Sequence, residues 1–124
     1  MRNRVIVYDD DKDILEVCSI ILNMRGYDVL CKENCKEVLA DISNYDPHVI
    51  LMDNWLPDVG GVKAVQLIKS IPKYKKIPVI FFSANSHVEE LAKEAGADFL
   101  LKKPFDIKGL EQVLKSAMAS RTPA

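Results

Sequence analysis

The chain has 124 residues, of which 48% are hydrophobic and 28% charged, a size and mix typical of one globular domain and not of a disordered, collagen-like or coiled-coil chain. Its 17 Lys and Arg residues nearly balance its 18 Asp and Glu residues, so overall charge favours neither nucleic acid nor an anionic membrane as a direct partner. Apolar runs such as 49–52 and 79–82 are far shorter than the roughly 20 residues that cross a bilayer, and no signal-peptide core follows the basic first residues. We therefore expect a cytoplasmic protein without a membrane span.

Three cysteines, Cys18, Cys31 and Cys35, are an odd number in a chain that lacks the features of a secreted protein. We expect reduced thiols that pack as small hydrophobic side chains. The spacing of Cys31 and Cys35 has no second pair of ligands to accompany it, which argues against a zinc site.

Short β-branched runs alternate five times with longer amphipathic stretches, a rhythm typical of an α/β fold. The predicted strands are Arg4 to Tyr8, Tyr27 to Cys31, His48 to Met52, Val79 to Phe82 and Phe99 to Leu101. The predicted helices are Asp13 to Arg25, Lys36 to Ile42, Val62 to Ser70, Ser86 to Ala95, and a last one that Asp106 caps. Because three of the strands are almost continuously apolar, we expect a doubly wound, five-stranded parallel sheet with five helices. Residues 1–120 form the predicted domain, and 121–124 a tail or the start of a linker.

The first predicted strand is followed directly by three consecutive carboxylates, Asp9, Asp10 and Asp11. Asp11 or Asp13 can cap the next helix, where the positive end of the helix dipole favours an anion. Asp9 and Asp10 belong to the edge of the sheet instead, which favours a functional role for these two.

The third predicted strand ends directly in another carboxylate, Asp53. Taken alone, Asp53 could simply accept hydrogen bonds from loop amides. If the first and third strands are neighbours, however, Asp9, Asp10 and Asp53 converge, and such a cluster requires a cation. Oxygen ligands favour a hard ion, so the sequence predicts Mg²⁺, with Mn²⁺ as the alternative.

The fourth predicted strand is followed by Ser83, and the fifth by Lys102 and Lys103. A serine there is often only a turn residue, and paired lysines usually form a solvated face. Together with a metal held by carboxylates, a hydroxyl and an ammonium group provide what a phosphoryl group needs for binding.

The ordered set of motifs resembles the receiver domain of two-component response regulators along the whole chain. The matching segments are Val7 to Asp11, Val49 to Asp53 with Leu56-Pro57 and Gly60-Gly61, Pro78 to Ala84, and Ala95 to Asp98 continuing to Lys103-Pro104-Phe105. The resemblance implies a flavodoxin-like fold with strand order 2-1-3-4-5. It also implies a phosphoacceptor switch that assists its own phosphorylation and dephosphorylation but is not an enzyme.

The resemblance further assigns roles to single residues. It implies that Asp53 accepts a phosphoryl group from a phosphohistidine of a sensor histidine kinase or phosphotransfer protein. The implied Mg²⁺ ligands are Asp10, with Asp9 assisting, Asp53 and the backbone carbonyl of Trp55. The implied phosphoryl contacts are Ser83, the backbone amide of Ala84, and Lys103, with a cis bond between Lys103 and Pro104.

The switch position departs from the family pattern. The family often has an aromatic switch residue three positions before the lysine, but here that position is Leu100, while Phe99 lies one residue earlier. Counting from Lys102 instead would bring Phe99 into place, although Pro104 favours Lys103. The resemblance also implies that Trp55 and Asn85 occupy positions that tune the attack of water on the phosphorylated form, and we expect the bulky Trp55 to slow hydrolysis.

Other classes of protein share parts of this pattern. Haloacid-dehalogenase-like phosphatases use an Asp-x-Asp motif, which Asp9 and Asp11 supply, but Asp13 stands where Thr or Val belongs. The same aspartates resemble the start of an EF-hand, but Ile14 replaces its glycine. A flavin-binding protein fits the fold, yet carboxylates after the first strand would repel the flavin phosphate. A receiver-like interaction module that is never phosphorylated remains the main alternative.

The expected output is a change in a partner-binding surface. In the family this surface is formed by the fourth helix, the fifth strand and the fifth helix, and the residues expected to be exposed there are Glu89, Lys93, Lys108, Gln112 and Lys115. The downstream target is unknown, and a homodimer that forms on phosphorylation is one form the output could take.

Overall fold

A computed structural model describes residues 2–54, 60–84 and 87–120. Its five strands form one parallel sheet in the order β2-β1-β3-β4-β5. The strands are β1 (Asn3–Tyr8), β2 (Tyr27–Lys32), β3 (Val49–Asp53), β4 (Val79–Ser83) and β5 (Phe99–Lys102). The helices are α1 (Lys12–Met24), α2 (Val38–Tyr45), α3 (Gly61–Ser70), α4 (Val88–Ala95) and α5 (Ile107–Ser120). The predicted fold class and strand order are therefore confirmed.

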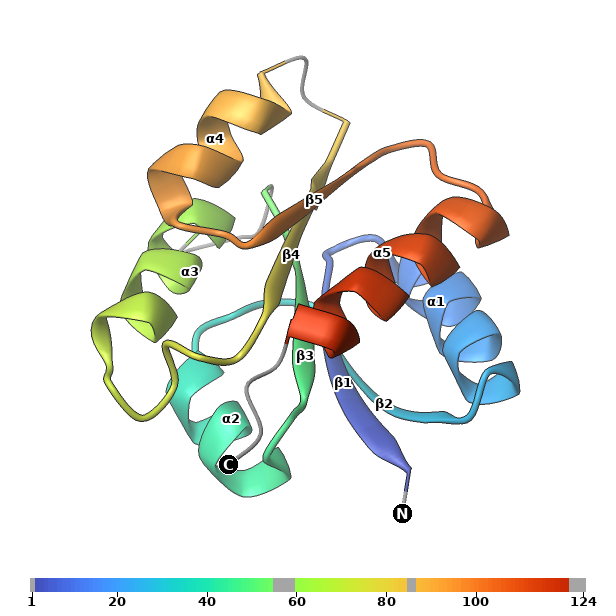
Figure 1. The fold of residues 1–124 in the computed structure, drawn as a ribbon, viewed down its shortest axis with the longest axis horizontal. Helices are drawn as coiled ribbons and strands as arrows, with labels where there is room; N and C mark the ends of the chain where they lie inside the picture. Colours follow the sequence, from blue (N-terminus) through green and yellow to red (C-terminus); the bar gives the residue numbers. More distant parts are fainter. Residues whose placement is uncertain (1, 55–59, 85–86, 121–124) are drawn as a thin grey trace.

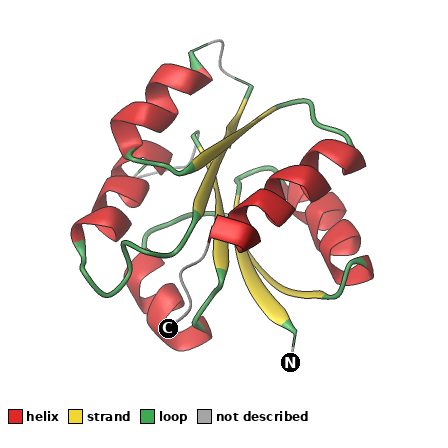
Figure 2. Cartoon of the chain, in the orientation of Figure 1, coloured by secondary structure: helices red, strands yellow, loops and turns green. Residues whose placement is uncertain are grey.

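The helices cover both faces of the sheet, with α1 and α5 on one face and α2, α3 and α4 on the other (Figures 1 and 2). Each face buries its own hydrophobic cluster. All five residues of β3 and of β4 are buried, whereas β2 at the sheet edge is only half-buried. The continuous apolar runs seen in the sequence thus correspond to central strands covered on both sides.

Local sequence signals account for several helix ends. The Asp11 carboxylate caps α1 by accepting a hydrogen bond from the Asp13 amide at 2.9 Å, and Asp106 caps α5 by accepting one from the Gly109 amide at 2.7 Å. Gly96 ends α4 in the left-handed conformation, with φ of 83°, as predicted. The predicted cap Ser86 lies outside the described residues, and α4 begins at Val88 with His87 before it.

Helix α2 differs from its predicted range of 36–42 at both ends. It starts later because the Asn34 side chain accepts a hydrogen bond from the Lys36 amide at 3.1 Å, which holds a turn where the helix was predicted to begin. It continues to Tyr45 because Asp46 ends it in the left-handed conformation, with φ of 54°. The Asp46 amide donates to the Ile42 carbonyl at 2.9 Å.

The amino ends of β4 and β5 are joined by a polar cluster around the half-buried Lys69 of α3. The Lys69 ammonium donates to the carbonyls of Lys75 and Ile77 and, at 2.7 Å, to the Asp98 carboxylate. The same Asp98 oxygen accepts the Val79 amide at 2.8 Å. We refer to this arrangement as the Lys69–Asp98 pair.

Cys18, Cys31 and Cys35 form no disulfide, as predicted. Burial raises the pKa of the Cys18 thiol to about 12, so it stays protonated. Within the described ranges, no helix combines the length and the apolar character needed to span a membrane.

Candidate functional site

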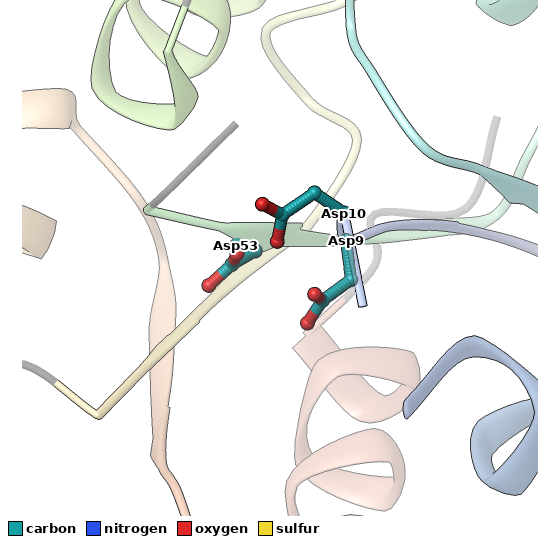
Figure 3. A group of neighbouring side chains, drawn as sticks. All are labelled: Asp9, Asp10 and Asp53. Atoms are coloured by element: carbon teal, nitrogen blue, oxygen red, sulfur yellow. The ribbon is translucent and has the colours of Figure 1, made fainter. Parts of the chain in front are cut away.

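The carboxyl ends of β1 and β3 lie side by side. Tyr8 pairs with Met52 in the parallel register of these two strands, so the next residue on each strand, Asp9 and Asp53, reaches the same edge of the sheet. Single carboxylate oxygens of Asp9, Asp10 and Asp53 all lie within 4.8 Å of one another, and Figure 3 shows the three side chains converging. The predicted acidic cluster is therefore formed.

The three carboxylates differ in exposure. Asp9 is fully buried and Asp53 is 2% exposed, whereas Asp10 is exposed. Burial, together with the negative charge of Asp9, raises the pKa of Asp53 to about 6. Burial also raises the pKa of Asp9, against the opposing effect of its bond to Lys103. The cluster therefore carries more negative charge than its surroundings stabilise.

Lys103 supplies the positive charge that faces this cluster. Its ammonium nitrogen lies 2.7 Å from Asp9 Oδ2 and 3.2 Å from Asp53 Oδ1. Burial alone would lower the pKa of Lys103, but the hydrogen bonds and charges of Asp9 and Asp53 outweigh it and raise that pKa. Lys103 therefore stays charged, and its single charge stands against three carboxylates.

The Lys103 ammonium also packs against an aromatic ring. Its nitrogen lies 4.8 Å from the centre of the Phe82 ring, within the range of a cation–π contact. The Phe105 ring packs edge-on against Phe82, with centroids 6.2 Å apart. The bond between Lys103 and Pro104 is cis, as the resemblance implied.

The acids are not equally available to a ligand. Asp9 is held by two donors, Lys103 and the Asp11 amide, which reaches its other oxygen at 2.9 Å. Among the described residues, no hydrogen bond or ion pair engages the Asp10 carboxylate. Asp10 and the oxygen of Asp53 turned away from Lys103 can therefore bind a hard divalent cation directly, while Asp9 contributes mainly charge. An all-oxygen donor set of this kind suits Mg²⁺.

Ser83 is placed beside the acids by the register of β3 and β4. Phe82 pairs with Asp53, so Ser83 lies one residue beyond that pair. Ser83 is 1% exposed, and its carbonyl accepts the Lys103 amide at 3.0 Å. Ala84, which follows it, is exposed. Trp55 and Asn85 lie outside the described residues, so their proposed roles stay predictions.

Gly61 is a site residue to which the sequence analysis gave no role. A Cβ atom on Gly61 would lie 2.0 Å from the carbonyl oxygen of Asp53, and the Gly61 amide donates to the Asn54 carbonyl at 3.2 Å. Any side chain here would push α3 away from the end of β3. The paired glycines seven and eight residues after Asp53 were the available signal, but sequence alone does not show what they approach.

The fifth strand settles which lysine faces the site. Lys103 bonds to Asp9 and Asp53, whereas Lys102 points to solvent and lies 3.5 Å from Glu89 of α4. Phe99 packs with the hydrophobic cluster beneath α1 and α5, and Leu100 is 37% exposed. The residue three positions before Lys103 is thus an exposed leucine. Phe99 packs against the hydrophobic cluster and does not take the switch position.

The described geometry does not favour the phosphatase reading of Asp9 and Asp11. Asp11 is used as the cap of α1, and both oxygens of Asp9 are already bound. A nucleophile at Asp9 assisted by Asp11 would require both side chains to leave these partners.

Comparisons with known proteins agree with this geometry. A family model described as the response regulator receiver domain matches residues 5–115. The chain is 32% identical over 122 residues to Protein PilG of Pseudomonas aeruginosa, covering 97% of this chain and 90% of PilG. It is 30% identical to the phosphate regulon transcriptional regulatory protein PhoB of the same organism, covering 96% of this chain but 53% of PhoB. It is also 33% identical to the CAI-1 autoinducer sensor kinase/phosphatase CqsS of Vibrio cholerae, of which it spans 16%.

Solved structures give the same result. The chemotaxis protein CheY4 of Vibrio cholerae superposes with a TM-score of 0.86 at 25% identity, covering 94% of this chain and 99% of that one. A CheY-like response regulator receiver domain protein of Methanospirillum hungatei has a TM-score of 0.86 at 26% identity, covering 96% and 95%.

Proposed function

The chain belongs to the response regulator receiver domain family, and on that premise we propose that Asp53 is its phosphoacceptor. Receiver domains are signalling switches of two-component systems and in general are not catalytic enzymes. The observation that carries the proposal is the position of Asp53, which lies within the acidic cluster and bonds to Lys103 at 3.2 Å. The proposed donor is a phosphohistidine of a sensor histidine kinase or phosphotransfer protein.

The transfer is a displacement at phosphorus. An oxygen of the Asp53 carboxylate attacks the phosphorus atom, a new O–P bond forms, and the N–P bond of the phosphohistidine breaks with its electron pair returning to the imidazole. Lys103 neutralises negative charge that develops on the phosphoryl oxygens. The Ser83 hydroxyl and the Ala84 amide follow the neighbouring strand and donate hydrogen bonds to the same oxygens.

The described residues fit a divalent metal ion. Asp10 and Asp53 would hold Mg²⁺, or Mn²⁺ in its place, with Asp9 completing the charge. When bound, the ion neutralises the repulsion between the carboxylates and the incoming phosphoryl group. Three acids against one lysine support this assignment, because the excess charge would otherwise oppose an anionic donor.

Phosphorylation changes the charge at Asp53 from −1 to a value of about −1.5 to −2, and it adds acceptor oxygens. Ser83 and Lys103 are the groups placed to respond. They lead directly into the surface of α4, β5 and α5, where the side chains predicted to face a partner, Glu89, Lys93, Lys108, Gln112 and Lys115, are exposed. A downstream target or a second copy of the chain would bind there. With an exposed Leu100 in the switch position, we expect this change to proceed without rotation of an aromatic ring.

The direct test is phosphorylation with a small donor. The chain is incubated with acetyl phosphate and Mg²⁺, and its intact mass is followed. We expect a gain of one phosphoryl group, lost in Asp53→Asn and retained in Asp98→Asn, a matched variant at the far edge of the sheet. No gain in the unaltered chain would favour the unphosphorylated interaction module, and sustained turnover of a phosphomonoester would instead point to a phosphatase.

A further inference from the structure

A closed set of bonds lies directly behind the acidic cluster. The Tyr8 hydroxyl donates to Asp41 Oδ2 at 2.9 Å, in a buried hydrogen bond between β1 and α2. The other oxygen of Asp41 lies 3.5 Å from the Lys32 ammonium. The Lys32 carbonyl in turn accepts the Asp9 amide at 3.1 Å, and Asp9 is bonded covalently to Tyr8. We call this set the Tyr8–Asp41–Lys32 bridge.

The bridge is buried at its centre. Tyr8 is fully buried and Asp41 is 9% exposed. Burial and the hydrogen bond to Asp41 raise the pKa of Tyr8, so its hydroxyl stays a donor. A buried carboxylate is costly unless it is hydrogen-bonded or paired with a charge, and Asp41 has both kinds of partner in Tyr8 and Lys32. This arrangement therefore needs a reason beyond filling space, which an apolar pair could do as well.

Its position suggests that reason. Tyr8 is the last residue of β1, and Asp9 and Asp10 follow it without a spacer. The Asp10 side chain makes no described bond of its own, so the direction of its carboxylate depends on the backbone from which it extends. The bridge fixes that backbone from both sides, through the Tyr8 side chain and through the Asp9 amide.

We propose that Tyr8 and Asp41 are positioning residues for the metal ligands, holding the Asp9–Asp10 backbone so that the Asp10 carboxylate meets Asp53. Neither residue touches the ion, and both act through the main chain of β1. This inference rests on the magnesium site of the proposed function and adds α2 to the elements that control it.

The test measures Mg²⁺ affinity separately from stability. Trp55 is the single tryptophan of the chain and lies two residues after Asp53 in the sequence, so its fluorescence follows a Mg²⁺ titration, which calorimetry repeats independently. Tyr8→Phe keeps the ring and removes only the hydroxyl. We expect its Mg²⁺ dissociation constant to rise about three- to tenfold, less than the roughly 10- to 100-fold effect of partners that bond directly to metal ligands, because Tyr8 acts only through the backbone.

Two variants of the acid provide a rescue test. Asp41→Asn keeps an acceptor for Tyr8, and we expect nearly unaltered Mg²⁺ affinity, whereas Asp41→Ala should weaken binding at least as much as Tyr8→Phe does, because it also removes the partner of Lys32. The double variant with Tyr8→Phe and Asp41→Ala should bind Mg²⁺ no more weakly than Asp41→Ala alone, because the Tyr8–Asp41 bond is already absent in that single variant. Tyr45→Phe, on the same helix, is the matched control and should not change affinity.

The outcomes separate the two proposals. If the unaltered chain binds no Mg²⁺ by either method, the metal site of the proposed function fails and the positioning role falls with it. If the unaltered chain binds Mg²⁺ and Tyr8→Phe binds it equally well, with only the unfolding midpoint lowered, the bridge is purely structural and the inference alone is wrong. Should Tyr8→Phe fail to fold, equal affinities in Asp41→Asn and Asp41→Ala would overturn it.

Discussion

Two lysines lie at opposite ends of the parallel strands, Lys69 at the amino ends and Lys103 at the carboxyl ends. They make similar bonds with different consequences. Lys69 and Lys103 each lie 2.7 Å from a carboxylate oxygen, and their side chains are 17% and 15% exposed. Lys69 has one carboxylate and two carbonyls as partners, and Asp98 accepts a backbone amide as well. Lys103 faces Asp9 and Asp53, with Asp10 beside them.

The difference lies in whether the charges balance. At the Lys69–Asp98 pair one positive charge meets one negative charge, and each group has hydrogen-bond partners, so the pair joins α3, β4 and β5 and requires no ligand. At the other edge, burial and the surplus of carboxylates raise the pKa of Asp53 to about 6. A balanced pair stabilises the fold, whereas an unbalanced cluster is suited to bind a cation and to react.

Replacing each lysine in turn should give the largest difference between the two sites. We expect Lys103→Met to slow phosphorylation by acetyl phosphate by about 100-fold or more, since it removes the fixed positive charge facing the phosphoryl oxygens. Lys69→Met should leave that rate close to normal while lowering the unfolding midpoint. Stopped-flow or mass-based rates, with thermal unfolding, measure both effects. Equal rate losses in the two variants would mean that Lys103 acts only through the fold.

Neutralising one acid at each edge should change stability in opposite directions. Asp98→Asn should lower the free energy of unfolding by about 1 to 2 kcal/mol, because it weakens charged hydrogen bonds. Asp53→Asn should raise it at pH 7.5 by about 1 to 3 kcal/mol, since a folded-state pKa about two pH units above normal corresponds to about 3 kcal/mol. Urea unfolding without divalent metal measures both changes.

The sign of the Asp53 effect is also visible in its pH dependence. The folded chain keeps the Asp53 proton up to a pH of about 6, whereas the unfolded chain loses it near pH 4. The stability associated with this group is therefore full below about pH 4 and is lost as the pH rises through about 6. Asp53→Asn should lack this part of the slope. A gain in stability that is the same at pH 3.5 and pH 7.5 would contradict the assignment.

Alanine substitutions at two glycines test whether the close packing of α3 against the end of β3 positions Asp53. Gly61→Ala places a methyl group against the Asp53 carbonyl, so we expect a loss of about 1 to 3 kcal/mol in the free energy of unfolding, together with slower phosphorylation. Gly109→Ala in α5 is the control, because its Cβ would meet side-chain atoms and no backbone, with Asp106 Oδ1 at 3.1 Å and Leu101 Cδ1 at 3.7 Å. If Gly61→Ala phosphorylates normally, the close approach of α3 does not position Asp53.

The sequence predicts what depends on local pattern and strand order. The place of Asp53 at the carboxyl end of β3 could be predicted because a carboxylate directly follows an apolar run, and Lys103 could be preferred to Lys102 because Pro104 follows it, whereas their roles came from the family resemblance. The Tyr8–Asp41 bond and the contact of Gly61 with Asp53 could not be predicted, because each depends on how a helix packs against a distant strand end. The range of α2 was missed for a smaller reason: the Asn34 turn competes with the helix at residues that have helical propensity.

The most direct test of the phosphoacceptor assignment is to locate the modification chemically. Borohydride reduces an aspartyl phosphate to homoserine, and peptide mapping then identifies the altered position. After treatment with acetyl phosphate and Mg²⁺, we expect homoserine in place of Asp53 only, with Asp9, Asp10 and Asp98 unchanged. Homoserine at Asp9 or Asp10 with Asp53 intact would contradict the assignment.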